Sequence, residues 1–232
     1  VRMMLCLSIS QGWKTRQVDF DNAFVQADID DMVYLRSPAG FESPNHDEPV
    51  VLRLKKSLYG LVQAPMLYYN HLKAGLKDRG LVPSEHDPCM FIGRGMIILS
   101  YVDNCLFFGP DLDEIDKVIK EMQENNMPLT VEADDAYAFL GVDISPDPKT
   151  GGFLMSQKGL IDKVLTETKM SDCKAKQTPA SATPLGTDAD GPAFNHEFDY
   201  PRVVGMLMYL ASNSQPDIQY AVHQCARFTY CP

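Results

Sequence analysis

The chain has 232 residues, 45% of them hydrophobic and 22% charged, with a formal net charge of −10; this composition fits one globular domain or two small lobes. Its longest apolar runs are far shorter than the ~20 residues that a membrane-spanning helix needs, so we expect no membrane segment. The acidic balance argues against a free-standing nucleic-acid binder, because contacts from Lys and Arg to phosphates supply most of the affinity of such proteins.

Periodicity in the first 80 residues predicts a helix at each end and short strands between them. The second helix is interrupted early by Gly60 and Pro65, which indicates a loop that leads into it. A loop containing Pro38, Gly40 and Pro44 separates two of the strands. The expected elements are a helix over 1–12, strands over 16–20, 33–36 and 50–54, and a helix over 57–79.

The rest of the sequence predicts hairpins and helices, with one linker. Two apolar, β-prone runs flank Val102-Asp103-Asn104, which is typical of a tight hairpin with polar residues at its tip. Ser156 is the expected N-cap of a helix, and residues 171–198 lack periodicity and are predicted to be a linker. The expected elements are strands over 96–101 and 105–108, a helix over 113–124, a hairpin over 137–144 and 152–155, and helices over 156–169, 203–210 and 217–228. In the helix over 113–124 the apolar residues Ile115, Val118, Ile119 and Met122 share one face.

Two carboxylates stand out because each is predicted at a strand edge. Asp19 lies on or at the end of an alternating strand, and Asp103 lies between the two apolar runs. Adjacent strands could bring the two side chains together, where they would repel each other unless a cation neutralised them. Mg²⁺ suits such a pair, because it uses few carboxylates and completes its shell with water and phosphates. The alternative for Asp103 is a plain turn former.

Three motifs resemble those of a known family. Tyr101-Val102-Asp103 between apolar strands resembles the Tyr-x-Asp-Asp hairpin of reverse transcriptases, and Gln17-Val18-Asp19 with the following Ala23-Phe24 is similar to their first catalytic motif. Residues 57–65, Ser-Leu-Tyr-Gly-Leu-Val-Gln-Ala-Pro, resemble a run of copia-type retrotransposons. The likeness continues in family order through residues 87–91, 139–144, 156–158, 205–210 and 216–218.

The resemblance implies an α+β fold, a right-hand polymerase palm of antiparallel sheet and helices over 1–144, with the fingers largely missing. A mostly helical thumb or connection region would follow over 145–232. The implied activity is RNA-directed DNA polymerase, as part of a retrotransposon polyprotein, with two Mg²⁺ ions held by Asp19, Asp103 and Asn104. Its implied partners are an RNA/DNA primer-template and dNTP in the full-length polyprotein, inside a cytoplasmic virus-like particle or the nucleus.

Further roles follow from matching positions, each beside a simpler interpretation. Phe24 would lie under the sugar of the incoming nucleotide and exclude a 2′-hydroxyl, or it is a core aromatic. Gly60 would let the backbone approach the nucleotide, or it only forms the turn before a helix. The other implied residues are Tyr59 and Tyr101 for nucleotide binding, and Phe139, Leu140 and Gly141 for primer support, the last three also fitting an ordinary hairpin.

The sequence departs from the family pattern at Asn104, where the family has a second Asp. Asn can offer a neutral carbonyl ligand, but it removes one negative charge from the metal site, so Asn104 predicts an impaired polymerase activity. A catalytically decayed element, or an acidic protein-interaction module adopted by a host, are therefore alternative functions. Six cysteines without a Cys-x-x-Cys pair favour a reduced, intracellular protein. The start at Val1, with no cleavage site after it, indicates a truncated chain rather than a signal peptide.

Overall fold

The structure, a computed structural model, describes residues 1–40, 51–132, 137–187, 191 and 194–230. It divides into two compact units, Val1–Asp134 and Asp135–Pro232. All the strand pairs within the described residues are antiparallel, and helices accompany the sheets of both units. The expected α+β class, a mixture of helices and antiparallel sheet, is therefore confirmed at that level. The boundary between the two units follows residue 134, ten residues before the expected boundary at 144.

The first unit is built on a six-stranded sheet in the order β4-β5-β6-β7-β1-β8. Apolar residues alternate along β6, so that Met96, Ile98 and Ser100 are buried on one face. β7 is buried along most of its length because both of its faces are covered. The strands are β1 (Lys14–Phe20), β4 (Val82–Pro83), β5 (Met90–Gly93), β6 (Met96–Tyr101), β7 (Asn104–Gly109) and β8 (Leu129–Val131).

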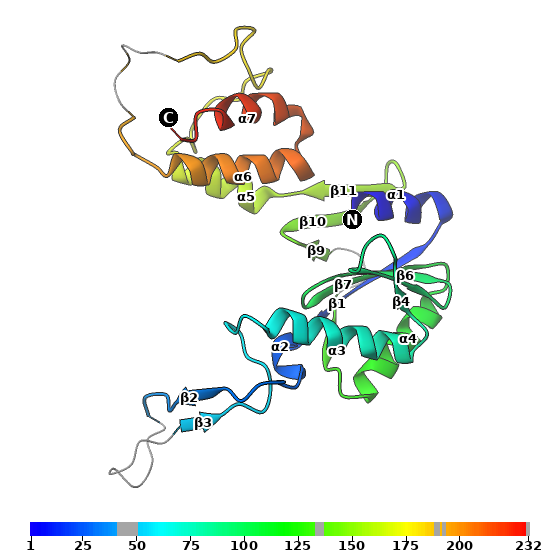
Figure 1. Ribbon diagram of the computed structural model, residues 1–232. Coiled ribbons are helices and arrows are strands. Elements are labelled where there is room, and N and C mark those ends of the chain that lie inside the picture. The colour runs from blue at the N-terminus through cyan, green and yellow to red at the C-terminus, as the bar shows by residue number, and fades with distance from the viewer. Residues whose placement is uncertain (41–50, 133–136, 188–190, 192–193, 231–232) are drawn as a thin grey trace. The chain divides into compact units, whose positions relative to one another are not determined.

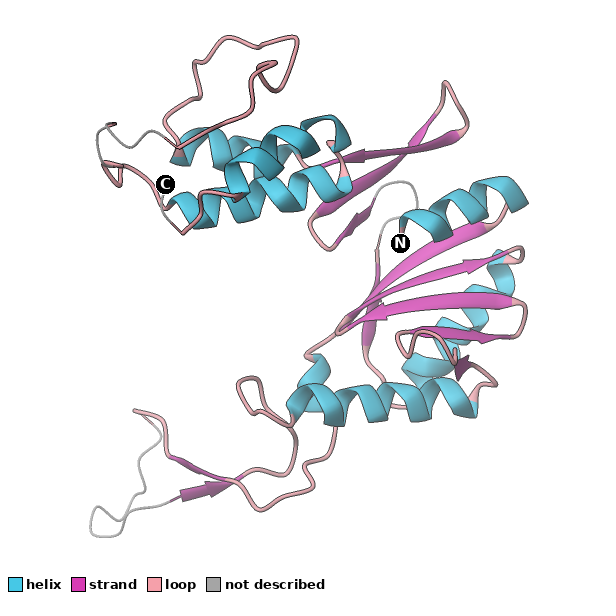
Figure 2. Cartoon of the chain, turned by 45° about the horizontal axis from the view of Figure 1, so that its top comes forward, coloured by secondary structure: helices cyan, strands magenta, loops and turns pink. Residues whose placement is uncertain are grey.

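Helices cover the two faces of this sheet, as Figures 1 and 2 show. α3 (Ala64–Asp78) and α4 (Leu112–Glu124) pack on one face, and α1 (Arg2–Gln11) contacts β7 on the other. Along α4 the buried side chains recur at helical spacing, and the carboxylate of Asp111 caps the first turn by accepting from two backbone N–H groups. The buried residues of α4 are Ile115, Val118, Ile119 and Met122, the face predicted from the sequence.

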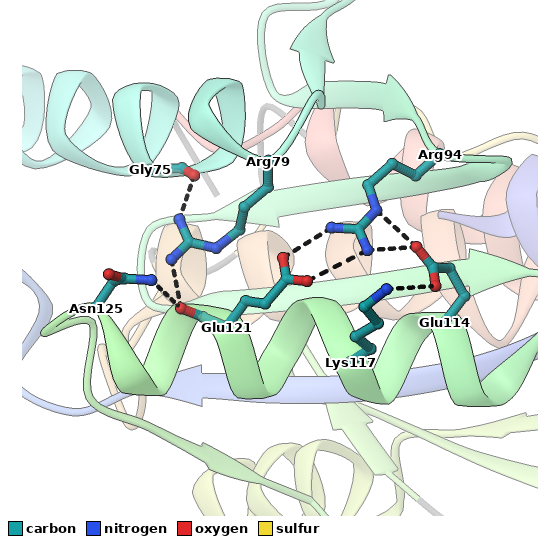
Figure 3. A network of polar contacts seen from close by, with 7 residues as sticks. All are labelled: Gly75, Arg79, Arg94, Glu114, Lys117, Glu121 and Asn125. Atoms are coloured by element: carbon teal, nitrogen blue, oxygen red, sulfur yellow. Dashed lines mark hydrogen bonds and ion pairs between the residues drawn. The ribbon is translucent and has the colours of Figure 1, made fainter.

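A polar network joins α3, the turn between β5 and β6, and α4 (Figure 3). Arg94, in that turn, binds the carboxylates of Glu114 and Glu121 on α4. Arg79, just after α3, donates to the backbone carbonyls of Gly75 and Glu121. The hydrogen bonds from Arg94 lower the pKa of Glu121 and hold it ionised. The network fixes both helices on the sheet that carries the strand ends described below.

A small two-stranded sheet lies between β1 and α3 in the chain. β2 (Tyr34–Arg36) pairs with β3 (Val51–Arg53), and an isolated bridge joins Asp28 to Lys56. The same two residues form an ion pair with Nζ 2.7 Å from the carboxylate. Two of the residues predicted for this region, Pro44 in the loop and Val50 at the strand start, lie outside the described residues.

The second unit combines a three-stranded sheet, in the order β11-β10-β9, with helices. Its buried apolar residues include Phe139, Ile144, Val164 and Leu210. The described residues between 170 and 198, where the sequence predicts a linker, contain no helix or strand. The elements are β9 (Tyr137–Phe139), β10 (Val142–Asp147), β11 (Gly152–Ser156), α5 (Lys158–Glu167), α6 (Tyr200–Asn213), the 3₁₀ helix η1 (Pro216–Ile218) and α7 (Gln219–Ala226).

Local predictions differ from the structure where a turn or strand end overrides the periodicity. The single strand expected over 137–144 is two strands, because Leu140 (φ 55°) and Gly141 (φ 70°) form a turn with both residues at positive φ. Ser156 ends β11 and does not cap α5, whose N-cap is Gln157. Asn104, expected at a hairpin tip, is the first residue of β7.

Candidate functional site

The two predicted carboxylates lie side by side at one end of the sheet. β1 runs antiparallel to β7, and its register pairs Asp19 with Asn104. Directly paired residues present their side chains on the same face. The backbone N–H of Phe20 donates to the carbonyl of Asp103 at 2.8 Å, which fixes the β6–β7 turn beside the end of β1. A sequence separation of 84 residues, 103 minus 19, is thus closed by strand pairing.

The side chain of Asn104 links Asp103 to the neighbouring strand β1. Its amide nitrogen donates to a carboxylate oxygen of Asp103 at 3.3 Å, and its amide oxygen accepts from Gln17 Nε2 at 3.0 Å. Gln17 is almost fully buried and lies diagonally across the β1–β7 ladder. Tyr101, which pairs with Asn104 on the other side, is more than half exposed. Tyr101, Asn104 and Asp19 therefore form a row across three strands.

The electrostatics of this row reflect an excess of negative charge. The pKa of Asp19 is raised from its ordinary value, first by burial and then by the charges of Asp103, Glu132 and Asp21. The thiol of Cys105 also has a raised pKa, because it is buried and both Asp103 and Asp19 disfavour a further anion. A bound cation would relieve this repulsion, since opposite charges favour the ionised carboxylates.

The β6–β7 turn holds a side chain in an unfavourable backbone conformation. Tyr101 pairs with Asn104, so that Val102 and Asp103 are its two central residues. Val102 has φ 54°, in the left-handed region that a β-branched residue rarely adopts. Such a conformation costs on the order of 1–3 kcal/mol and persists only where neighbouring contacts fix it. Here the contacts of Asp103 and Asn104 with β1 fix it.

An aromatic cluster lies at the start of α3, next to the short helix α2 (Ala23–Gln26). The ring of Phe24 is 4.6 Å from that of Tyr59 and 6.0 Å from that of Tyr68, centroid to centroid. Phe24 is partly buried against the core, and Tyr59 is half exposed. Gly60 has φ 95°, and a Cβ placed there would meet no atom within 4 Å. A glycine at position 60 therefore permits this positive φ, and the space beside the backbone is open.

One cavity joins the aromatic cluster to the hairpin turn. It has a volume of about 160 Å³ and lies between α2, α3 and the β6–β7 turn. Phe24 lines it on one side and Val102 on another, with Tyr68 in the wall that α3 provides. The charges of Asp103 and Asp19 contribute to a raised pKa of the Tyr68 phenol, after the larger effect of burial. The carboxylates and the aromatic cluster thus belong to one region.

The predicted primer-support residues belong to the second unit. Phe139 is buried and closes β9, whereas Gly141 is exposed in the turn that follows. The Tyr209 hydroxyl, from α6, donates to the carbonyl of Leu140. This contact fixes a turn whose residue Leu140 has positive φ. Leu140 and Gly141 therefore form a two-residue hairpin turn that Tyr209 supports, and Phe139 is the strand residue directly before it.

Two neighbours of the site had no role in the sequence-based predictions. Gln17 was visible only as part of a motif, and its contact with Asn104 depends on the strand register. Tyr68 follows a clear signal, because Ala64, Tyr68, Leu72 and Leu76 recur every four residues and are all buried. That spacing predicts a core helix face but not the cavity.

Within the described residues, no group of three or more His, Cys, Asp or Glu side chains could hold a metal.

Comparison with known proteins identifies related sequences. Residues 1–182 match the family described as "Reverse transcriptase (RNA-dependent DNA polymerase)". The Retrovirus-related Pol polyprotein from transposon RE2 of Arabidopsis thaliana is 32% identical over 236 residues, covering 100% of this chain and 16% of that protein. The corresponding polyprotein from transposon TNT 1-94 of Nicotiana tabacum is 29% identical over 244 residues, covering 100% of this chain and 18% of that protein.

Among solved structures, telomerase from Candida albicans aligns with 71% of this chain and 37% of its own, at 10% identity. Its TM-score of 0.35 is too low to define a shared fold. The chain spans less than a fifth of the length of the two Pol polyproteins. On the family match over residues 1–182, the chain belongs to the reverse transcriptase (RNA-dependent DNA polymerase) family, as its resemblance to copia-type retrotransposons predicted.

Proposed function

We propose that this chain is the catalytic part of an RNA-directed DNA polymerase encoded by a retrotransposon, and that Asp19 and Asp103 are its catalytic carboxylates. The pairing of Asp19 with Asn104, beside the turn that carries Asp103, is the observation that supports this most directly. The first unit, within the expected span 1–144, is the palm in this proposal. Residues 145–232 are the thumb or connection region. The template, the primer and dNTP are substrates of the longer polyprotein.

The donors at the strand ends fit Mg²⁺ better than a softer metal. They are carboxylate oxygens of Asp19 and Asp103 with the amide oxygen of Asn104, and Mg²⁺ binds one or two carboxylates and takes its other ligands from water and phosphates. The pKa of Asp19 is raised first by burial and then by the charges of Asp103, Glu132 and Asp21, and a bound cation would offset the part that comes from these carboxylates. When bound, two such ions supply charge neutralisation at the attacking and leaving oxygens of phosphoryl transfer.

The remaining residues bind and orient the substrates in this proposal. Phe24, held by Tyr59 and Tyr68, stands against the sugar and excludes a 2′-hydroxyl. Tyr59 and Gly60 border the open space before α3 in which a nucleotide is held, and Tyr101 extends the row of polar residues on β6. In the second unit, Phe139, Leu140 and Gly141 support the primer end through the turn that Tyr209 fixes.

Removing one carboxylate tests the proposal. In the full natural polypeptide that contains these residues, Asp103→Asn should slow primer extension on an RNA template by roughly 100-fold or more, as does loss of a group that stabilises transition-state charge. Asp78→Asn, an exposed carboxylate at the end of α3, is the matched control and should extend as the parent does. Equal rates for Asp103→Asn and the parent, in an active polypeptide, would refute the assignment.

The second candidate is a decayed element that keeps the fold without catalysis, or a host-adopted interaction module. Asn104 in place of the family's second Asp favours the first of these, and the net charge of −10 favours the second. The polymerase assay distinguishes both alternatives from an enzyme, because a full-length parent that is as inactive as Asp103→Asn would be a relic or an interaction module. No described helix is long and apolar enough to cross a membrane; the proposed site of action is the virus-like particle or the nucleus.

The assignment of Phe24 as a sugar gate, the residue that excludes a 2′-hydroxyl, has its own test. In the active polypeptide, Phe24→Val should raise ribonucleotide incorporation relative to dNTP by roughly tenfold or more, because a smaller side chain admits the 2′-hydroxyl. Misincorporation on an RNA template measures this. Unchanged discrimination together with a loss of about 3 kcal/mol in unfolding free energy, as in a large-to-small core change, would establish the core interpretation instead.

A further inference from the structure

Tyr68 is a buried polar side chain that the fold itself does not explain. It is 2% exposed, and its hydroxyl oxygen is buried without a hydrogen-bond partner among the described residues. An unpaired buried hydroxyl destabilises the folded state, and native proteins hold few of them. Its neighbour Tyr69 differs, because that hydroxyl donates to the carbonyl of Pro88 at 3.1 Å. A phenylalanine at position 68 would fill the core equally well and avoid the cost.

Tyr68 lies between the proposed gate residue, the end of β1 and a cavity. Its ring packs edge-on against Phe24 at 6.0 Å and against Phe20 at 6.2 Å, which links the gate to the end of β1. It lines the 160 Å³ cavity that Phe24 and Val102 also line. Burial raises the pKa of its phenol, and the charges of Asp103 and Asp19 add to this effect. The Tyr68 side chain thus lines the region where the proposed substrate would bind.

We propose that the Tyr68 hydroxyl is a further nucleotide-binding group, which donates a hydrogen bond to an oxygen of the nucleotide that binds beside Phe24. This inference rests on the proposed function and deepens it. A neutral donor suits the position, because the phenol stays protonated next to two carboxylates and can donate without adding charge. Its desolvation is a cost of the free protein that substrate binding would offset.

A water molecule is the competing explanation for the unpaired hydroxyl. The cavity is large enough for water, but an ordered water needs two to four polar partners. The cavity wall is mainly apolar, with Phe24, Pro65, Leu72 and Val102 among its residues. The hydroxyl of Ser100, also in the wall, already donates to the Cys89 carbonyl at 3.4 Å. The wall therefore favours a ligand that brings its own polar atom.

The test removes only the hydroxyl, with Tyr68→Phe in the full natural polypeptide. Affinity for a dNTP is measured by equilibrium binding with Ca²⁺ in place of Mg²⁺, and the Tm is measured without nucleotide. We expect the dissociation constant to rise about five- to tenfold, the effect of one lost hydrogen bond, while the Tm is unchanged or higher. Tyr69→Phe, which removes a paired hydroxyl, is the matched stability control and should lower the Tm.

Each outcome decides the inference. A lower Tm for Tyr68→Phe with parental dNTP affinity would overturn it and identify a structural hydroxyl, paired with water. Parental affinity with an unchanged Tm would also overturn it. If Asp103→Asn abolishes primer extension in either case, the proposed function stands and only the role of Tyr68 fails. A parent that binds no dNTP would overturn both.

Discussion

The two hairpin turns of the molecule solve the same problem in different ways. The β6–β7 turn holds Val102 at φ 54°, and the β9–β10 turn holds Leu140 at φ 55°. In the first unit the turn lies inside a six-stranded sheet, where the backbone of β1 and the side chains of Gln17 and Asn104 fix it. In the second unit the Leu140 carbonyl is fixed by one side chain, Tyr209, from 69 residues away.

The β6–β7 turn, where catalysis is proposed, is held in place more firmly than the β9–β10 turn. The β6–β7 turn, which carries Asp103 and is called the carboxylate turn below, has little freedom. β7 is paired on both sides and covered on both faces, so moving the turn would break ladder hydrogen bonds and expose the core. The β9–β10 turn is part of a three-stranded sheet and depends on a partly exposed tyrosine. Catalytic groups need positions fixed to a fraction of an ångström, whereas a surface that supports a primer can adjust.

The largest expected effect tests whether the two units are separately stable. Phe107 is fully buried in β7, and Phe107→Ala should reduce the unfolding free energy of the first unit by about 3–5 kcal/mol. The matched change in the second unit is Leu210→Ala, expected to cost about 2–5 kcal/mol there. Amide hydrogen exchange reports each unit. Loss of protection confined to the unit that carries the substitution is the expected result, and equal loss in both would show one cooperative core.

The next effect concerns the contact between Tyr209 and the β9–β10 turn of the second unit. Tyr209→Phe removes the hydroxyl that donates to Leu140, which should cost about 0.5–1.5 kcal/mol and increase hydrogen exchange in the β9–β10 turn. In the full polypeptide the KM for primer-template should rise, with little change for dNTP. Tyr220→Phe, a half-exposed tyrosine of α7, is the control. Parental exchange in the turn would show that the hydroxyl is not what fixes it.

Much of the fold was predictable because burial follows local pattern. The face of α4 at Ile115, Val118, Ile119 and Met122 was predicted in full, since helical spacing and burial coincide there. The turn at Leu140 and Gly141 was not, because a leucine at positive φ goes against its own preference and is fixed by the distant Tyr209. Short edge strands such as β4 and β8 were missed because they carry too few residues for a period.

The site was predictable in its residue types and less so in its contacts. Asp19 and Asp103 follow from a strand edge and a hairpin tip, and the structure brings them together. The contacts of Asn104 with Gln17 and Asp103 depend on register and rotamer, which a single sequence does not contain. The burial of the Tyr68 hydroxyl likewise follows from the packing of α2, α3 and the hairpin, three segments that are separate in the sequence.

The smallest expected effect, Asn104→Asp, tests the carboxylate turn itself. Asn104 is directly opposite Asp19 and donates to Asp103, so that a carboxylate there loses a donor and places like charges across the ladder. Without metal, the unfolding free energy should fall by about 0.2–1 kcal/mol, the range for like charges in directly opposed strand positions. The same added charge should strengthen Mg²⁺ binding through attraction. Stability and metal affinity are therefore expected to change in opposite directions.

The measurement is a Tm series for Asn104→Asp and the parent across a Mg²⁺ titration, with Asp103→Asn as the reference that lacks one proposed ligand. Mg²⁺ should raise the Tm of Asn104→Asp most and that of Asp103→Asn least, because at a given Mg²⁺ concentration tighter binding stabilises the folded state more. In the full polypeptide, Asn104→Asp should also extend primers faster and at lower Mg²⁺. Equal Tm shifts and rates in Asn104→Asp and the parent would make Asn104 an adequate ligand or a bystander, and the proposed impairment would then be wrong.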